Sequence, residues 1–201
     1  NGLTYTVTAI GQNAFEGAIG ITSVTLPATV DSIAPQAFKG CVNLKEVILN
    51  DGLLYIDESA FANCINLPEV IIPGTVWYIG NYAFSKCSSL EYIYIPESVV
   101  ILGDGAFINC GNLRSITLPS SISEVGNSVF TNCSKLETVI MPGVEYVGSF
   151  CFKNFTSLQF ITANLGDVTY FGESAFEACK SLANISINSG VQNVGINAFK
   201  G

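Results

Sequence analysis

The segment 90–113 reads LEYIYIPESVVILGDGAFINCGNL, and versions of it recur along almost the whole chain. A small residue followed by phenylalanine marks each copy. The nine phenylalanines follow one another at spacings of 23, 23, 23, 23, 23, 22, 24 and 23 residues: Phe15, Phe38, Phe61, Phe84, Phe107, Phe130, Phe152, Phe176 and Phe199. A unit of this length cannot bury its own apolar face, so neighbouring units must stack on one another. The repeat therefore predicts a solenoid of eight or nine coils.

Each unit begins with a stretch typical of a β-strand. In residues 92–95 apolar side chains alternate with outward-facing ones, which is the two-residue period of a strand with one buried face. A proline ends this stretch in five units: Pro27, Pro73, Pro96, Pro119 and Pro142. The loss of one backbone donor costs least at a strand end. The stretch therefore predicts one short strand per coil.

The second half of each unit reads V-x-x-I-G, as in residues 76–80, and then continues to the phenylalanine. A residue type that caps helices often follows the glycine, such as Asn81, so we expect a short helical or 3₁₀ segment here. Glycine or asparagine usually stands two residues after the phenylalanine, which predicts a left-handed turn residue; Lys86 and Ala178 depart from this pattern. Residues 142–144 are one residue short and 164–168 one residue long, and we expect the turns to absorb both changes.

Composition excludes several classes of protein. Hydrophobic residues make up 49% of the 201 residues, which excludes intrinsic disorder. Sixteen acidic residues against eight basic ones give a net charge of −8, which works against a nucleic-acid or anionic-membrane binder. The chain has no histidine, so serine–histidine, cysteine–histidine and histidine–metal sites are excluded. No apolar run reaches the roughly 18–20 residues of a membrane-spanning helix.

The cysteines invite a disulfide or metal interpretation. Six of the seven share the position three residues after the phenylalanine: Cys41, Cys64, Cys87, Cys110, Cys133 and Cys179. Stacked neighbours about 5 Å apart fall within disulfide range, so distance alone does not exclude bridges. However, Ala18 and Phe155 occupy the same position in two units, and no CxxC pair of a zinc site occurs. We interpret the cysteines as buried core thiols.

Carboxylates are the other candidates for chemistry. Glu46 and Glu69 share one repeat position, and Glu58, Asp104 and Glu173 share another. Paired carboxylates can perform acid–base chemistry or bind Ca²⁺, but neither group has the sequence pattern of a calcium loop. A solvated face or a helix N-cap explains them more simply. We therefore expect no catalytic residue, no cofactor and no metal ligand.

The consensus L-x-x-I-x-L-P-x-x-V-x-x-I-G-x-x-A-F-x-x-C-x-x-L resembles the bacterial surface-antigen (BspA-like) leucine-rich repeat family over essentially the whole chain. The resemblance implies a right-handed, curved α/β solenoid with a parallel β-sheet on its concave face. It also implies a secreted or cell-surface protein that acts in adhesion and protein recognition. Residues 1–7 look like the short strand that often precedes such arrays, and the chain stops in mid-unit at Gly201. We expect residues 1–201 to form one domain that is a fragment of a longer protein.

The second and fourth residues after each repeat leucine should point away from the core, forming one exposed face. Tyr92 and Tyr94 lie at its centre, and the other candidate ligand-binding residues are Glu69, Ile71, Glu46, Ile48, Ile140 and Phe160. Exposed apolar surface with aromatic residues is typical of a recognition patch, although cross-strand packing is an alternative for the two tyrosines. A second aromatic line favours packing over ligand contact: Tyr55, Trp77, Tyr78, Tyr146 and Tyr170.

The sequence therefore favours a non-enzymatic extracellular recognition or adhesion module. Its partners would be a protein or a carbohydrate on a host or neighbouring cell, with no nucleic acid and no membrane insertion. The alternative is a structural spacer that has no ligand of its own. A carbohydrate-active β-solenoid is least favoured, because Arg114 is the only arginine and no cluster of acids and bases accompanies it.

Overall fold

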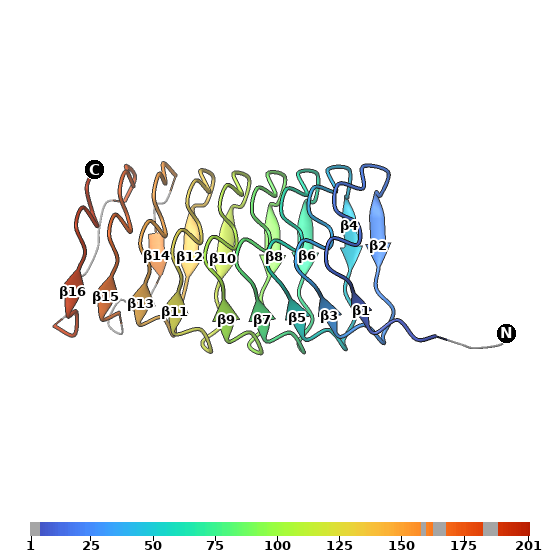
Figure 1. Ribbon diagram of the computed structural model, residues 1–201. Helices are drawn as coiled ribbons and strands as arrows, with labels where there is room; N and C mark the ends of the chain where they lie inside the picture. The colour runs from blue at the N-terminus through green and yellow to red at the C-terminus, as the bar shows by residue number, and fades with distance from the viewer. Residues whose placement is uncertain (1–4, 158–159, 163–167, 183–188) are drawn as a thin grey trace.

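A computed structural model describes residues 5–157, 160–162, 168–182 and 189–201. The coils stack along one axis, so the first and last described residues lie at opposite ends of the molecule (Figure 1). Every strand pair is parallel, and partners come from successive coils. The predicted solenoid with parallel strands is confirmed.

Two rows of strands run along the solenoid (Figure 1). The first row contains the three-residue strands β2 (Ser23–Thr25), β4 (Glu46–Ile48), β6 (Glu69–Ile71), β8 (Tyr92–Tyr94), β10 (Ser115–Thr117), β12 (Thr138–Ile140) and β14 (Phe160–Thr162). The second row contains two-residue strands: β1 (Ala9–Ile10), β3 (Ser32–Ile33), β5 (Tyr55–Ile56), β7 (Tyr78–Ile79), β9 (Ile101–Leu102), β11 (Glu124–Val125), β13 (Tyr146–Val147), β15 (Tyr170–Phe171) and β16 (Asn193–Val194). We call them the long row and the short row.

The register survives the irregular coils, as expected. Thr138 pairs with Phe160 between β12 and β14, and Tyr146 pairs with Tyr170 between β13 and β15. In the short segment 142–144 two backbones lie close together, since a Cβ on Gly143 would lie 2.2 Å from the carbonyl oxygen of Ser120. The compensating insertion falls largely on residues 163–167, outside the described residues.

The Ala-Phe segments form turns, and none of the described residues lies in a helix, so the helical prediction was wrong. From Phe15 to Phe176, the residue two before each of the regularly spaced phenylalanines and the residue two after it are both left-handed, as at Ser59 (φ 54°) and Asn63 (φ 61°). A right-handed helix cannot continue through such residues. Alternate amides also leave the coil: the amides of Ser59, Phe61 and Asn63 donate to carbonyl oxygens of the next coil. The turns thereby form a third hydrogen-bonded ladder.

The phenylalanines stack in one column inside the solenoid. Consecutive rings lie 5.0–5.7 Å apart between centroids, with interplanar angles of 0–16°. Phe15 is 40% exposed at the N-terminal end of the column, whereas Phe107 is fully buried. Phe155, which replaces a cysteine, is also buried and contacts Phe152 edge to face.

All seven cysteines are free thiols, consistent with the packing interpretation. The six that share one position each donate a hydrogen bond to the phenylalanine carbonyl oxygen of the preceding coil, as from Cys64 Sγ to Phe38 at 3.2 Å. The amide of Cys41 donates to that same oxygen. A carbonyl oxygen has two lone pairs, and here both are used. Cysteine therefore adds an inter-coil bond that alanine could not supply.

The N-terminal residues differ from the expected strand. Residues 1–4 are outside the described residues, and residues 5–8 have no strand pairing. The first strand begins at Ala9 and pairs with β3. The hydroxyl of Thr29 nevertheless donates to the carbonyl oxygen of Val7 at 2.6 Å, which ties this segment to the first coil.

Candidate functional site

The long row presents the face on which the candidate residues lie. In β6, β8 and β10 the middle side chain is buried and the two beside it are exposed, as for Val70 between Glu69 and Ile71. The middle valines of β2 and β4 are half-buried. Ile71 is 63% exposed, and Tyr92 and Tyr94 are 49% and 48% exposed. The predicted outward direction is confirmed for Glu46, Ile48 and Ile140 as well. The side chain of Phe160 lies outside the described residues, although its backbone belongs to β14.

Strand pairing brings the central candidates together. In the register of β6 and β8, Glu69 lies opposite Tyr92 and Ile71 lies opposite Tyr94. Each tyrosine therefore has a neighbour of a different chemistry within cross-strand reach. Ile140 is farther along the row, where it pairs with Thr117 of β10. The structure thus gathers Glu46, Ile48, Glu69, Ile71, Tyr92 and Tyr94 on three consecutive strands and leaves Ile140 apart.

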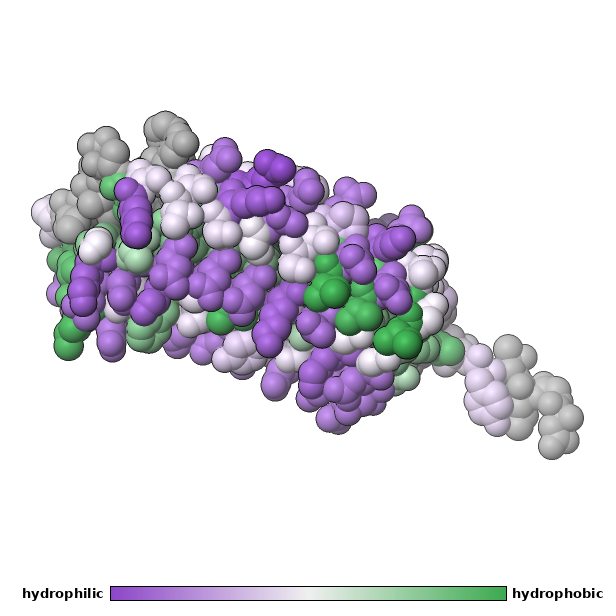
Figure 2. Space-filling view, turned by 90° about the horizontal axis from the view of Figure 1, so that it is seen from above, coloured by the Kyte–Doolittle hydropathy of each residue, from purple (hydrophilic) through white to green (hydrophobic). Residues whose placement is uncertain are grey.

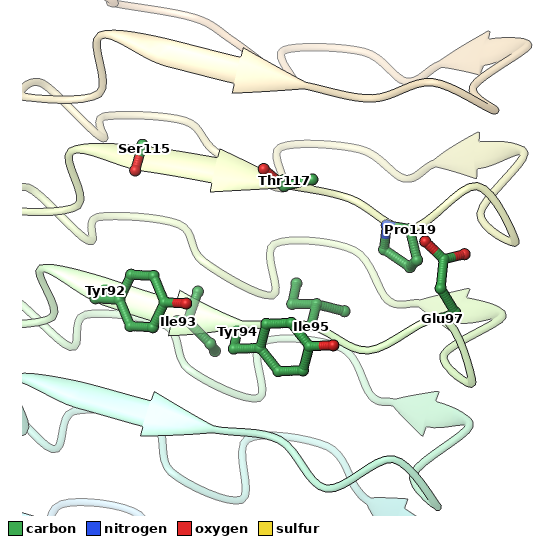
Figure 3. Close-up of a pocket in the computed structure, with 8 residues that line it drawn as sticks. All are labelled: Tyr92, Ile93, Tyr94, Ile95, Glu97, Ser115, Thr117 and Pro119. Atoms are coloured by element: carbon green, nitrogen blue, oxygen red, sulfur yellow. The ribbon is translucent and has the colours of Figure 1, made fainter.

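A groove separates β8 from β10 on this face. Figure 3 shows the rings of Tyr92 and Tyr94 along one side and the short side chains of Ser115 and Thr117 along the other. Its volume is about 280 Å³, and Glu97 lies at one end. The sheet is interrupted here, because β8 pairs with β6 and β10 pairs with β12, but β8 and β10 do not form a ladder. Because the side chains of β10 are smaller than those of β8, the two tyrosine rings form one wall of the groove.

A second groove of about 380 Å³ lies between β4 and β6. Glu46, Ile48, Glu69 and Ile71 line it, together with Lys45 and Asp51. The sheet is interrupted here too, and the sequence explains why. Lys45 and Glu91 each donate a backbone hydrogen bond to the preceding coil. In the coil between them the equivalent residue is Pro68, which has no N–H to donate. A proline inside the repeat therefore opens the groove between the two glutamates.

The charges around these grooves are mainly negative. Glu46, Glu69 and Asp51 line one groove and Glu97 the other, while Lys45 is the only basic residue that lines either. Arg114 forms an ion pair with Glu91 at 3.7 Å, and both side chains are more than half exposed. Such an exposed pair contributes little to stability. Among the described residues, no three histidine, cysteine or acidic side chains are grouped so that they could hold a metal ion.

The aromatic line on the short row consists of side chains that pack on one another. Tyr146 and Tyr170 stack with centroids 4.3 Å apart, and Trp77 lies edge to face against Tyr55 at 5.1 Å. Burial, followed by the charges of Asp57 and Glu58, raises the pKa of Tyr78. These contacts support the packing interpretation of this line.

Sequence reasoning missed an apolar edge at the N-terminal coils. Figure 2 shows apolar groups gathered over these coils, whereas rows of polar groups follow the later ones. Ile19 and Ile65 are 67% and 37% exposed, and each stands four residues after its phenylalanine. Side-chain amides of Asn43 and Asn66 donate to the carbonyl oxygens of Ile19 and Val42, so the backbone of this edge is bonded from coil to coil.

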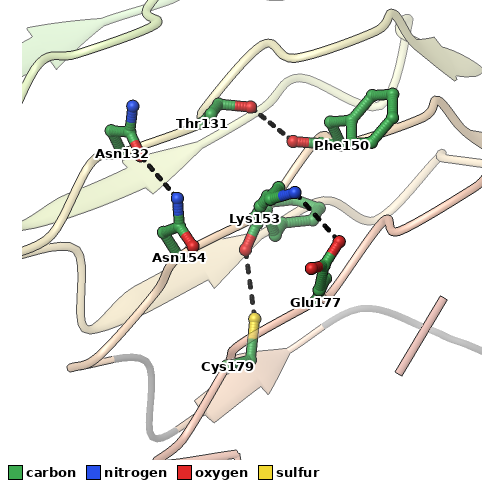
Figure 4. A network of polar contacts seen from close by, with 8 residues as sticks. Thr131, Asn132, Phe150, Lys153, Asn154, Glu177 and Cys179 are labelled. Atoms are coloured by element: carbon green, nitrogen blue, oxygen red, sulfur yellow. Dashed lines mark hydrogen bonds and ion pairs between the residues drawn. The ribbon is translucent and has the colours of Figure 1, made fainter. Parts of the chain in front are cut away.

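The turns at the C-terminal half carry ladders of polar side chains instead (Figure 4). Asn154 Nδ2 donates to Asn132 Oδ1 at 2.9 Å, and Asn132 Nδ2 donates to Asn109 Oδ1 at 2.8 Å. Lys153 pairs with Glu177 at 3.0 Å beside them. The asparagines that the sequence assigned to left-handed turns therefore also bond the coils to one another.

The profile of the BspA-type leucine-rich repeat region matches in six copies, over residues 8–137 and 101–201. The chain belongs to this family. Comparison with curated proteins finds no match.

Several solved bacterial structures are similar to this BspA-type chain. A leucine-rich repeat protein of T. pallidum has 29% identity and a TM-score of 0.71, covering 89% of this chain and 72% of that one. A leucine-rich repeat protein from Eubacterium ventriosum has 25% identity and a TM-score of 0.72, covering 84% and 46%. A leucine-rich cell surface protein from Faecalibacterium prausnitzii has 28% identity and a TM-score of 0.59, covering 97% and 61%. The chain thus spans about half to three quarters of these proteins.

BspA-type and related leucine-rich repeats are generally not enzymes, and the chain has the form of a bacterial repeat or recognition module. Within the described ranges, no helix has the length and apolar character needed to cross a membrane.

Proposed function

We propose that the chain is a non-enzymatic recognition module, secreted or held at a bacterial cell surface, which binds a protein or glycan of a host or neighbouring cell. The observation that carries this proposal is the exposed pair Tyr92 and Tyr94 beside the groove between β8 and β10. Tyrosine combines a large apolar ring with a hydroxyl, and its side chain loses little conformational freedom on binding. The description of the F. prausnitzii relative as a cell surface protein supports the location.

The acidic groove between β4 and β6 extends this surface. Ile48 and Ile71 supply exposed apolar contact, while Glu46 and Glu69 would orient a partner through hydrogen bonds or charge. The stacked core fixes the strands of the long row, so the surface is formed before the partner binds. Preformed surfaces avoid much of the ordering cost of association.

The test is a binding screen of the intact chain against glycan and extracellular-matrix protein arrays, beside the variant Tyr92→Ala/Tyr94→Ala. We expect a ligand whose affinity falls at least tenfold in the variant, because truncating central aromatic contacts typically costs about 2 kcal/mol or more. The matched control is Val100→Ala/Ile101→Ala, since these residues are 49% and 44% exposed but lie on the short row or beside it.

The thermal unfolding midpoints of the parent, the tyrosine variant and the control variant must agree within a few degrees for their affinities to be compared. A ligand bound equally by the tyrosine variant and by the parent would contradict this site. Silence on every array would favour the alternative function, a spacer that holds other domains away from the cell surface.

A further inference from the structure

A third groove lies on the side of the solenoid formed by the Ala-Phe turns, away from the sheet face proposed above. Its volume is about 460 Å³. The groove crosses several coils, and its lining includes Lys39, Ser59, Asn63, Tyr82, Lys86 and Asn109. One aromatic ring, two ammonium groups and several amide or hydroxyl groups therefore border one hollow.

Two of these residues stand where the fold prefers others. Tyr82 (φ 57°) and Lys86 (φ 59°) are the two left-handed residues of one turn. Most other coils place glycine, asparagine or serine at these positions, which adopt a left-handed conformation at lower cost or bond locally in it. Among the described turns, this is the only one in which a tyrosine and a lysine coincide in this way. Residues kept in costly conformations often serve a function.

The next coil makes room for the tyrosine. A Cβ on Gly105 would lie 2.4 Å from Cε1 and 2.6 Å from Cδ1 of Tyr82, so the ring packs closely against the glycine of the next coil. Gly105 is also the only glycine at that turn position in the described coils. The side chain of Tyr82 remains 43% exposed on this support. The groove thus has an accessible aromatic ring that packs against the next coil.

The charge of the groove is opposite to that of the whole chain. Two of the eight basic residues line it, and no carboxylate is among the lining residues, although the chain has a net charge of −8. Lys39 pairs with Glu16 at 3.1 Å, whereas Lys86 takes part in none of the ion pairs among the described residues. Lys86 therefore offers an ammonium group to an external anion.

We propose that this groove binds an acidic glycan, with a sugar ring on Tyr82 and its carboxylate at Lys86. Aromatic faces pack against the apolar face of a sugar ring, and a charge-assisted hydrogen bond to a carboxylate is stronger than a neutral one. Asn63, Asn109 and Ser59 supply donors and acceptors for the sugar hydroxyls. The shared chemistry is a pyranose that carries a carboxylate, whether a sialic acid or a uronic acid.

The experiment measures binding of four probes by calorimetry: 3′-sialyllactose, its methyl ester, trigalacturonate and its methyl ester. We expect at least one acidic probe to bind and its neutral counterpart to bind at least tenfold more weakly. The first pair tests sialic acid as the source of the carboxylate, and the second pair tests uronic acid. Absence of binding by both acidic probes, or equal binding of the neutral ones, would overturn the proposal.

Variants that carry the residues found at the same turn positions in other coils test the roles of Tyr82 and Lys86. Tyr82→Ser and Lys86→Asn place residues common at these turn positions, so both should fold at least as stably as the parent while losing at least tenfold in affinity. Lys86→Arg keeps the charge and should retain binding. The matched controls Phe150→Ser and Ala178→Gly change the same turn positions outside the groove and should leave binding intact. Unchanged affinity in Lys86→Asn, or equal loss in the controls, would refute the assignment.

Discussion

At the scale of single residues, the glycine of the V-x-x-I-G step is required by contact between coils. A Cβ on Gly148 would lie 2.5 Å from the carbonyl carbon of Gly126, and the neighbours are backbone atoms that cannot move aside. We expect Gly148→Ala to lower the free energy of unfolding by about 1–3 kcal/mol, as overpacking does. Gly74→Ala is the control, since nothing lies within 4 Å of a Cβ there. Urea denaturation of both variants measures this difference. If Gly148→Ala were as stable as Gly74→Ala, the coils would be able to move apart at Gly148 without cost.

The buried thiols should make the protein less stable at alkaline pH. Burial raises the pKa of Cys87 and Cys110 well above the ordinary value of 9.0 and that of Cys179 to about 12. Between about pH 9 and 12 the unfolded chain loses these protons while the folded chain keeps them, so stability falls as pH rises, by up to about 1.4 kcal/mol per pH unit for each thiol. Below pH 9 the contribution is fully present. We expect urea midpoints to be flat from pH 7 to 8.5 and to fall steeply above.

The double variant Cys87→Ala/Cys110→Ala provides the control for this pH dependence. It loses two inter-coil hydrogen bonds, so it should be less stable than the parent at pH 7. Its stability should nevertheless decline less steeply above pH 9, because two fewer groups titrate. The same slope in both proteins would mean that other groups cause the alkaline loss.

At the scale of structural elements, we expect a ring at the centre of the phenylalanine column to contribute more to the free energy of unfolding than a ring at its end. We expect Phe107→Ala to lower the free energy of unfolding by about 3–5 kcal/mol, since it removes two stacked contacts and leaves a cavity. Phe15→Ala should cost much less, because that ring is 40% exposed and has one stacked neighbour. Calorimetric unfolding of both variants checks this; similar losses would mean that the column is not cooperative.

The elements also show which features a sequence reveals. Alternation in residues 92–95 and the regular phenylalanines predict strands and coils, because burial imposes both patterns. The helix at the turn was wrongly predicted, because capping residues such as Asn81 act between coils: its Oδ1 accepts from the amide of Asp104 in the next coil. Left-handed residues after the phenylalanine were predicted from Gly40 and Asn63. Those before it were missed, because tyrosine, glutamine and serine occupy that position in different coils.

At the scale of the whole molecule, the three ladders are not equally continuous. Neither row pairs its strands between the coil of β8 and β9 and the coil of β10 and β11. The turn ladder does cross this junction, through the amide of Phe107, which donates to the carbonyl oxygen of Val129. The outward direction of Tyr92 and Tyr94 could be predicted from alternation. The grooves beside them could not, because they depend on where pairing is interrupted and on how bulky neighbouring side chains are.

The inter-coil hydrogen bonds also decide how the molecule would respond to tension. They join successive coils along the axis, and the two ends of the described chain lie at opposite ends of that axis (Figure 1). A pull on both ends would therefore load one coil at a time, as in peeling, instead of shearing many strands together. Each coil released would lengthen the chain by about 80 Å, the reach of 23 extended residues. A tethered array of such coils would yield in small equal steps and absorb a sudden force without losing the coils that remain stacked.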